Sequence, residues 1–149
     1  MRQLIKKYLE DILYKGIFRP ILFTSRLGRK SMLGYADSGI NFDHIYTNRP
    51  SGYRWPGLFI DRILLNLPAS KATRQRKNRI GALLRKEVSE NQRANRTTRI
   101  VDLASGPARY LIELMDETRD RIEALCLDID RRSLSRGKLV AKDKPIIYK

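Results

Sequence analysis

The sequence has few of the side chains on which disulfides and metal sites depend. Its 149 residues include one cysteine, Cys126, and one histidine, His44. A lone cysteine cannot form an intramolecular disulfide, and zinc sites draw on several Cys and His ligands, so we expect neither feature. Cys126 lies inside an apolar run, which favours a buried thiol over a nucleophile. His44 has no visible partner beyond Asp43, and we assign it no catalytic role.

Long apolar runs and acidic residues are also scarce. No apolar run approaches the roughly 18 residues that span a bilayer, and the N-terminus lacks the apolar segment of a secretory signal, so we expect a globular cytoplasmic protein. The net charge is +15; residues 1–100 hold 21 Lys and Arg against 7 Asp and Glu, whereas residues 101–149 hold 10 against 9. This excess indicates attraction to nucleic acid, anionic lipid or an acidic substrate, or a solvated basic surface.

The stretch from Arg99 to Tyr110 has the pattern of a strand, a turn and the start of a helix. The apolar residues Ile100, Val101 and Leu103 are typical of a parallel strand buried on both faces. The small residues Ala104, Ser105 and Gly106 allow a sharp turn and close approach of a ligand to the main chain. A helix follows, and its N-terminus offers free backbone N–H groups and a positive dipole end.

A second apolar run over residues 122–127, broken only by Glu123, ends in Asp128-Ile129-Asp130. In nucleotide-binding βαβ units, a carboxylate roughly 20 residues or more after the turn accepts hydrogen bonds from ribose hydroxyls. Asp128 has this spacing, which favours a nucleoside ligand. Asp130 precedes a helix over 131–140, and we interpret it as the N-cap of that helix.

Residues 101–110, Val-Asp-Leu-Ala-Ser-Gly-Pro-Ala-Arg-Tyr, followed by Leu-Cys-Leu-Asp-Ile-Asp at 125–130, resemble the first two motifs of class I S-adenosylmethionine-dependent methyltransferases. The preceding Gly52-Tyr53-Arg54-Trp55-Pro56-Gly57 is similar to a group of bacterial methyltransferases, some of them fused to a hydrolase-like domain. The resemblance implies S-adenosylmethionine as cofactor and a cofactor-binding set of Asp102, Ala104, Ser105, Gly106, Arg109, Asp128 and Ile129.

Within that set, the resemblance implies that Asp102 and the turn at 104–106 face the methionine portion and that Asp128 holds the ribose. The family turn usually carries glycines where this chain has Ala104 and Ala108. No catalytic residue and no metal ligand is assigned. The methyl acceptor is not readable from the sequence.

The remaining segments are interpreted from their periodicity. Helical spacing predicts an amphipathic helix over 2–15, ended by Gly16. Glycine, proline and aromatic residues predict an ordered but irregular segment from Pro20 to Pro56. In it, Tyr46 and Tyr53 either line a substrate pocket or pack as aromatics. Further helices are expected over 58–67 and, capped by Ser70, over 71–92, and Pro145 to Lys149 resembles the opening of a third strand. The apolar stripe of the 71–92 helix is Ile80, Leu83, Leu84 and Val88.

We therefore expect an α/β fold: a partial Rossmann-like methyltransferase sheet of two to three parallel strands, preceded by a mainly helical region. Residues 1–98 form a helical, basic cap region in this interpretation, and residues 99–149 begin the cofactor-binding domain. The chain resembles an N-terminal fragment of a longer methyltransferase. Its first strand is then a sheet edge, which exposes unpaired backbone and favours self-association.

The leading function is methyl transfer from S-adenosylmethionine, by a longer parent protein or by this chain with a partner. The alternative is a basic module in which residues Lys71 to Lys86 contact nucleic acid or another anionic surface and the βαβ unit is structural. A nicotinamide-binding unit is a second alternative, although Ala104-Ser105-Gly106-Pro107-Ala108 lacks its three-glycine fingerprint.

Overall fold

The computed structural model describes residues 13–118 and 121–149, which divide into two compact units. The described residues of unit 1 are 13–37 and 48–70, and those of unit 2 are 38–47, 71–118 and 121–149. Most of the helix predicted over 2–15 lies outside the described residues. The boundary expected at residue 98 follows a change in sequence pattern, whereas the contacts also group 38–47 and 71–98 with the sheet.

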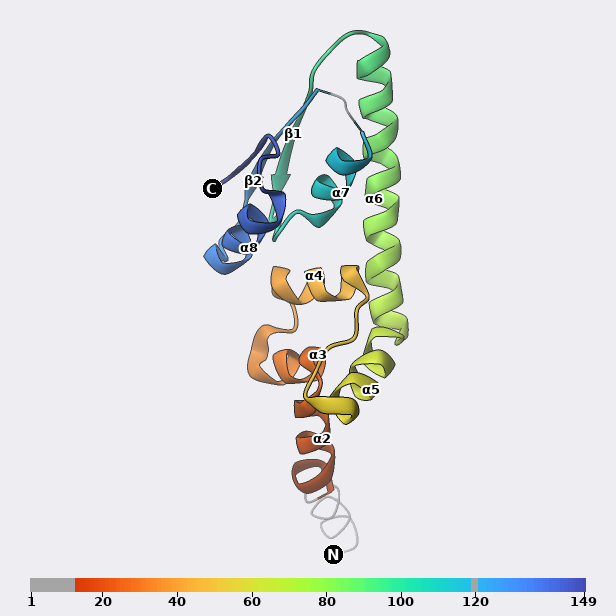
Figure 1. Ribbon diagram of the computed structural model, residues 1–149, viewed down its shortest axis with the longest axis vertical. Coiled ribbons are helices and arrows are strands. Elements are labelled where there is room, and N and C mark those ends of the chain that lie inside the picture. Colours follow the sequence, from red (N-terminus) through yellow and green to blue (C-terminus); the bar gives the residue numbers. More distant parts are fainter. Residues whose placement is uncertain (1–12, 119–120) are drawn as a thin grey trace, which may run out of the picture. The chain divides into compact units, whose positions relative to one another are not determined.

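Unit 2 contains a three-stranded parallel sheet (Figure 1). Its strands β1 (Thr98–Leu103), β2 (Ile122–Leu127) and β3 (Ile146–Tyr148) lie in the order β1-β2-β3. Helix α7 (Arg109–Glu117) connects the first pair and α8 (Arg131–Ala141) the second. A mostly helical N-terminal region followed by this sheet confirms the expected α/β class, a partial Rossmann-like arrangement.

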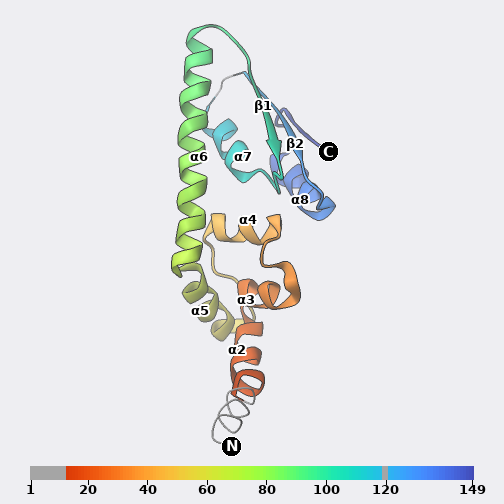
Figure 2. The same ribbon diagram turned by 180° about the vertical axis from the view of Figure 1, so that it is seen from behind.

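One face of the sheet carries the core of unit 2. Leu111 of α7 and Leu134 of α8 pack with the buried strand side chains Ala124 and Cys126. The long helix α6 (Pro68–Arg93) adds Val88, which contacts α7 and β2 through Leu114 and Ile122, so that α7 lies between α6 and the sheet (Figure 2). Leu83 was predicted in this stripe but is 66% exposed, because the buried side follows the four-residue spacing of 80, 84 and 88.

The prediction that the first strand is buried on both faces is wrong. Val101 is 63% exposed and Leu103 73%, and Ile147 of β3 is also exposed. Successive side chains of a strand point to opposite faces, and the core lies against the face that carries Ile100 rather than Val101. Strand β1 is also an end strand of the three, as expected for an edge.

Unit 1 is helical where irregular structure was expected, and that expectation was wrong. Its elements are η1 (Tyr14–Phe18), α2 (Arg19–Thr24), α3 (Arg26–Lys30), η2 (Ser31–Tyr35), α5 (Arg54–Leu65) and the first residues of α6, while α4 (Gly39–Thr47) belongs to unit 2. Three glycines of unit 1, Gly28, Gly52 and Gly57, are sites of close packing: a Cβ on Gly28 would lie 2.4 Å from the Leu22 carbonyl oxygen.

Two predicted helix boundaries are also wrong. Gly16 lies inside η1 and does not end a helix. Ser70 lies inside α6, where its hydroxyl donates to the Leu64 carbonyl at 2.8 Å instead of capping the helix. Both residues can serve in a helix interior, so composition alone did not locate the boundary.

A buried carboxylate holds unit 1 together. Asp61 of α5 is fully buried and accepts hydrogen bonds from the Ser25 hydroxyl at 2.6 Å, the Leu27 N–H at 2.8 Å and the Ser51 N–H at 2.9 Å. Ser25 also caps α3 by accepting from the Gly28 N–H. One side chain of α5 therefore holds the segment at Ser25 to Leu27 and the residue Ser51 in place.

The described residues offer neither a bilayer-spanning helix nor a cluster of metal ligands. None of the helices there is sufficiently long and apolar to cross a bilayer. Within residues 13–118 and 121–149, no group of three His, Cys, Asp or Glu side chains is placed to hold a metal ion.

Candidate functional site

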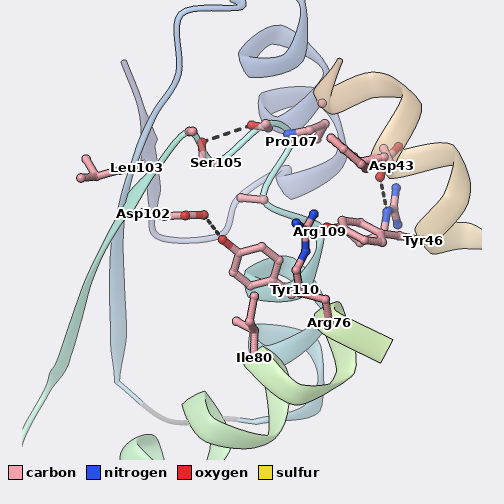
Figure 3. Close-up of a pocket in the computed structure, with 15 residues that line it drawn as sticks. Asp43, Tyr46, Arg76, Ile80, Asp102, Leu103, Ser105, Pro107, Arg109 and Tyr110 are labelled. Carbon is pink, nitrogen blue, oxygen red and sulfur yellow. Dashed lines mark hydrogen bonds and ion pairs between the residues drawn. The ribbon is translucent and has the colours of Figure 1, made fainter. Parts of the chain in front are cut away.

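A cavity of about 350 Å³ lies in unit 2, where β1 ends and α7 begins (Figure 3). Its wall comes from the turn over 102–110, from α4 and from α6. The residues of the two helices are Gly39, Phe42, Asp43, Tyr46, Arg76 and Ile80. This volume lies near the lower end of small-ligand sites, which run from about 300 to 1,000 Å³.

The turn between β1 and α7 has an uncommon backbone. Ala104, Gly106 and Ala108 have φ values of +55°, +54° and +53°, in the left-handed region. That region costs an L-residue roughly 1–2 kcal/mol and glycine very little. The turn is held by hydrogen bonds from the Ser105 N–H to the Leu127 carbonyl (3.1 Å) and from the Ala108 N–H to the Ser105 carbonyl (3.0 Å).

Asp128 braces this turn from the end of β2. Its Oδ2 accepts from the Gly106 N–H at 2.7 Å, and its Oδ1 accepts from the Asp130 N–H at 2.7 Å. Each carboxylate oxygen can accept a second hydrogen bond, so capacity for a ligand hydroxyl remains. Asp128 thus fixes the turn at a position where it can also face a ligand.

Asp130 caps α8, which confirms the interpretation made from the sequence. Its carboxylate accepts from the Arg132 N–H at 3.0 Å and from the Ser133 hydroxyl at 2.9 Å. Burial opposes ionisation, but these hydrogen bonds outweigh it and hold the pKa of Asp130 below its ordinary value. The carboxylate of Asp130 therefore stabilises the N-terminus of α8.

Asp102 points into the cavity and accepts a short hydrogen bond from the Tyr110 hydroxyl (Figure 3). Burial raises the pKa of Asp102; the hydrogen bond from Tyr110 opposes that rise, and the nearby charge of Asp128 adds to it. Burial and the bond to Asp102 also raise the pKa of Tyr110. The cavity thus contains a carboxylate whose negative charge is poorly solvated and would be stabilised by a cation.

Arg109 lines the cavity, but its Nε donates a short hydrogen bond to Asp43 of α4. The side chain of Asp43 is 6% exposed and also faces Arg136 of α8, with 3.7 Å between Nε and Oδ2. The bond to Asp43 raises the pKa of Arg109. The guanidinium of Arg109 therefore links the turn to α4 through Asp43.

Aromatic and cationic side chains form the helical wall. The rings of Phe42 and Tyr46 lie 6.4 Å apart, and the Arg76 guanidinium lies 5.5 Å from the Phe42 ring centroid. Lys77 lies 5.9 Å from the Tyr46 ring centroid and forms an ion pair with Glu113 at 2.6 Å. Two basic side chains of α6, Arg76 and Lys77, thus already contact other residues of unit 2.

The structure brings most of the predicted set together. Five members line the cavity: Asp102, Ala104, Ser105, Gly106 and Arg109. Asp128 lies behind the turn, while Ile129 is fully exposed and does not line the cavity. Tyr46 does line it, whereas Tyr53 belongs to unit 1.

The sequence interpretation missed the contributions of Gly39, Phe42, Asp43, Arg76 and Ile80. Their positions depend on how α4 and α6 pack against the turn, at separations that local patterns do not report. The pairing of Asp43 with Arg109 spans 66 residues. The four-residue spacing of Phe42 and Tyr46, and of Arg76 and Ile80, was the available signal that each pair shares a helix face.

Comparison with known families gives a match over residues 3–147 to a family described as "Putative methyltransferase". The match covers nearly the whole chain. This protein belongs to that methyltransferase family. No solved structure matches the chain.

A similar curated protein is the uncharacterized protein YnbC of Escherichia coli K12, which is 28% identical over 102 residues. The aligned region covers 68% of this chain and 17% of YnbC. The chain therefore corresponds to a small part of that relative's length.

The two alanines of the turn lie at backbone positions that favour glycine. In the class I methyltransferases that this turn resembles, glycines usually stand at the positions of Ala104 and Ala108, and here these are two of the positions with left-handed backbone. The chain retains the turn conformation that glycine favours, with side chains that oppose it.

Proposed function

We propose that unit 2 binds S-adenosylmethionine in the cavity at the end of β1 and that the protein transfers its methyl group to an acceptor. The observation that carries the proposal is the family match over residues 3–147, joined to a cavity at the turn after the first parallel strand. The C-terminal ends of parallel strands are where open α/β sheets bind their ligands.

The residues present fit such a cofactor. Asp102 offers a poorly solvated carboxylate to the positively charged methionine portion. Asp128 has acceptor capacity for ribose hydroxyls. Ala104 to Gly106 contribute backbone without bulky side chains.

When bound, S-adenosylmethionine supplies a methyl group on a positively charged sulfur, an intrinsically good leaving group. The protein's task is then to align the acceptor with the methyl carbon and to exclude competing reactions. We assign α4 and α6 to the acceptor side, because Tyr46, Arg76 and Ile80 form the wall opposite the turn. No side chain is assigned as a base.

Calorimetric titration of the 149-residue chain with S-adenosylmethionine, and separately with NAD, tests the proposal. We expect saturable binding of S-adenosylmethionine alone and at least a tenfold loss of affinity in Asp128→Ala. Asp143→Ala removes the same charge from an exposed position and is expected to bind normally. Absence of binding to a chain shown to be folded by circular dichroism would refute the proposal for this chain.

The nucleic-acid alternative has less structural support. Two of the basic residues on α6, Lys77 and Arg85, form ion pairs with Glu113 and Glu117 of α7. Their charges are partly offset, which weakens the patch that phosphates would contact. Nucleic-acid binding that falls steeply with salt, in a chain that binds no S-adenosylmethionine, would reverse this preference.

A further inference from the structure

The exposed aromatic side chains of the described residues lie in unit 1. They are Tyr14, Phe18, Phe23, Tyr35, Tyr53, Trp55 and Phe59. Trp55 is 78% exposed and Tyr53 67%. Single exposed apolar residues are ordinary, but a concentration of aromatic rings in one small unit is typical of a surface that binds something.

Two helical segments of unit 1 present apolar residues outward at helical spacing. Tyr14, Ile17, Phe18 and Ile21 recur at intervals of three and four residues in η1 and α2, and all are exposed. On α5, Trp55, Phe59 and Ile63 are exposed at four-residue intervals, while Gly57, Asp61 and Leu65 of the same helix are buried. Each segment thus has an apolar face that the described part of unit 1 does not bury.

Unit 1, which has these apolar faces, also carries an excess of positive charge. Residues 13–37 and 48–70 contain eight Lys and Arg, and their two acidic residues are Asp37 and Asp61. Asp61 is fully buried and engaged by three donors, so Asp37 is the acid on the described surface of this unit. That surface is strongly positive and complements an anionic partner.

Unit 1 contains a cavity of about 510 Å³ whose lining includes both basic and aromatic side chains. It is lined by Lys15, Arg19, Pro20, Phe23, Thr24, Arg29 and Tyr53. Three cationic side chains therefore lie around a hollow that also contains two aromatic rings. Phosphate oxygens attached to hydrocarbon have the matching chemistry, because cations pair with the phosphate while rings contact the apolar part.

From these observations we propose that unit 1 docks on an anionic phospholipid surface, with the cavity between Arg19, Arg29 and Phe23 receiving a headgroup phosphate. Aromatic and aliphatic side chains beside Lys and Arg are the composition of segments that lie in a membrane interface. Nucleic acid would contact the cations and stack on the rings, but exposed Ile17, Ile21 and Ile63 gain little there. The interface of an anionic bilayer accommodates the cationic, aromatic and aliphatic side chains together.

The test uses the single tryptophan of the chain, Trp55, as a reporter within unit 1. The full chain is titrated with vesicles of phosphatidylcholine containing phosphatidylglycerol and, separately, with vesicles of phosphatidylcholine alone. Binding is measured by co-flotation, and Trp55 emission is recorded in each titration. We expect co-flotation and a blue shift with the anionic vesicles only, because the indole leaves water when unit 1 docks.

Arg19→Glu/Arg29→Glu should weaken binding to the anionic vesicles by about tenfold or more, since each basic residue near such a surface contributes about 1 kcal/mol. Lys71→Glu/Arg79→Glu makes the same charge change on exposed residues of α6 and should retain binding. Circular dichroism establishes that both variants fold. Phe23→Ser, which keeps every charge, should also weaken binding.

Three results would overturn the proposal: no co-flotation of folded wild-type chain, equal losses in the two charge-reversal variants, or unchanged Trp55 emission in the bound state. A short single-stranded RNA is titrated in parallel at the same ionic strength. Tighter RNA binding that depends on Arg19 and Arg29 would assign the surface to nucleic acid instead.

Discussion

Ala104 and Ala108 carry side chains where the backbone favours glycine. Both have φ near +55°, but Ala104 is exposed while Ala108 is buried in the core beside Leu111. We predict that Ala104→Gly raises the free energy of unfolding by about 1 kcal/mol, because it removes the left-handed penalty without loss of packing. Thermal unfolding should show a rise of about 2–4 °C.

Ala82→Gly is the matched control, since Ala82 is exposed in the interior of α6. There the same change is expected to lower stability by about 1 kcal/mol, because glycine is a poor helix former. Ala108→Gly should give little net change, since relief of the backbone is offset by loss of a buried methyl group. Equal destabilisation at 82 and 104 would contradict the account of the turn.

The pKa of Asp102 gives a prediction about pH. Because burial raises this pKa above 3.8, the folded chain holds the proton to higher pH than the unfolded chain does. Folding is therefore favoured by protonation of this group at low pH, and that contribution is lost as the pH rises from 3.8 through the raised pKa. We predict that Asp102→Asn is more stable relative to wild type at pH 7 than at pH 3.

Unfolding in urea at the two pH values measures this difference. The asparagine oxygen can still accept from Tyr110, so the variant tests the charge more than the hydrogen bond. S-Adenosylmethionine binding should weaken in the same variant. A larger advantage at pH 3 than at pH 7 would show that the charge of Asp102 is stabilised in the folded chain.

At the scale of elements, the fit of α4 on the turn depends on two glycines. A Cβ on Gly39 would lie 2.8 Å from the Gly106 Cα and 2.7 Å from the Ser133 hydroxyl oxygen. We predict that Gly39→Ala lowers stability by about 1–3 kcal/mol and weakens S-adenosylmethionine binding, because α4 must move off the turn. Chemical denaturation and calorimetry measure the two effects.

Gly16→Ala provides the comparison. A Cβ at Gly16 meets nothing within 4 Å, and the residue lies in a helical segment of unit 1. This change should leave S-adenosylmethionine affinity unchanged. Normal stability and affinity in Gly39→Ala would mean that α4 does not depend on close contact with the turn.

The sequence predicted correctly those helices and strands that are specified by residues close together in the chain. Helix α8 was predicted from its N-cap Asp130 and strand β2 from a run of apolar residues, and β2 was placed at its observed bounds. The helices between Pro20 and Pro56 were missed because some of their glycines, such as Gly28 and Gly39, meet neighbouring segments, as Gly28 meets Leu22. Such contacts exist only once the chain has folded, so glycine content was misinterpreted as loop structure.

The same distinction applies to the candidate site. Asp102 and the turn were identified from the strand pattern and the family resemblance, and they do line a cavity. The wall from α4 and α6 was missed, because the ion pair of Asp43 with Arg109 joins distant segments. Local chemistry was therefore predictable, while the partners that enclose it were not.

For the whole molecule, the sheet leaves apolar side chains on its surface. Val101 and Leu103 of the end strand β1 are exposed, and a cavity of about 550 Å³ on this sheet includes Val101 and Ile147. We predict association that increases with concentration, because an edge strand and an apolar face are both templates for pairing. Sedimentation velocity over a tenfold or greater range of concentration measures it.

Val101→Lys should shift this equilibrium toward monomer by placing a charge on the edge strand. Leu139→Lys makes a comparable change at an exposed position of α8 and should leave association as in wild type. A monodisperse monomer at all concentrations, or equal effects of both variants, would contradict the prediction.

The most direct test of the central claim is a nuclear magnetic resonance titration of the ¹⁵N-labelled chain with S-adenosylmethionine. We expect the largest amide shifts to fall on residues 102–110 and 128–130 and to approach saturation, with much smaller shifts over the described residues of unit 1. Absence of shifts in a folded chain, or shifts concentrated outside the turn and the end of β2, would contradict the assignment of this cavity as the cofactor site.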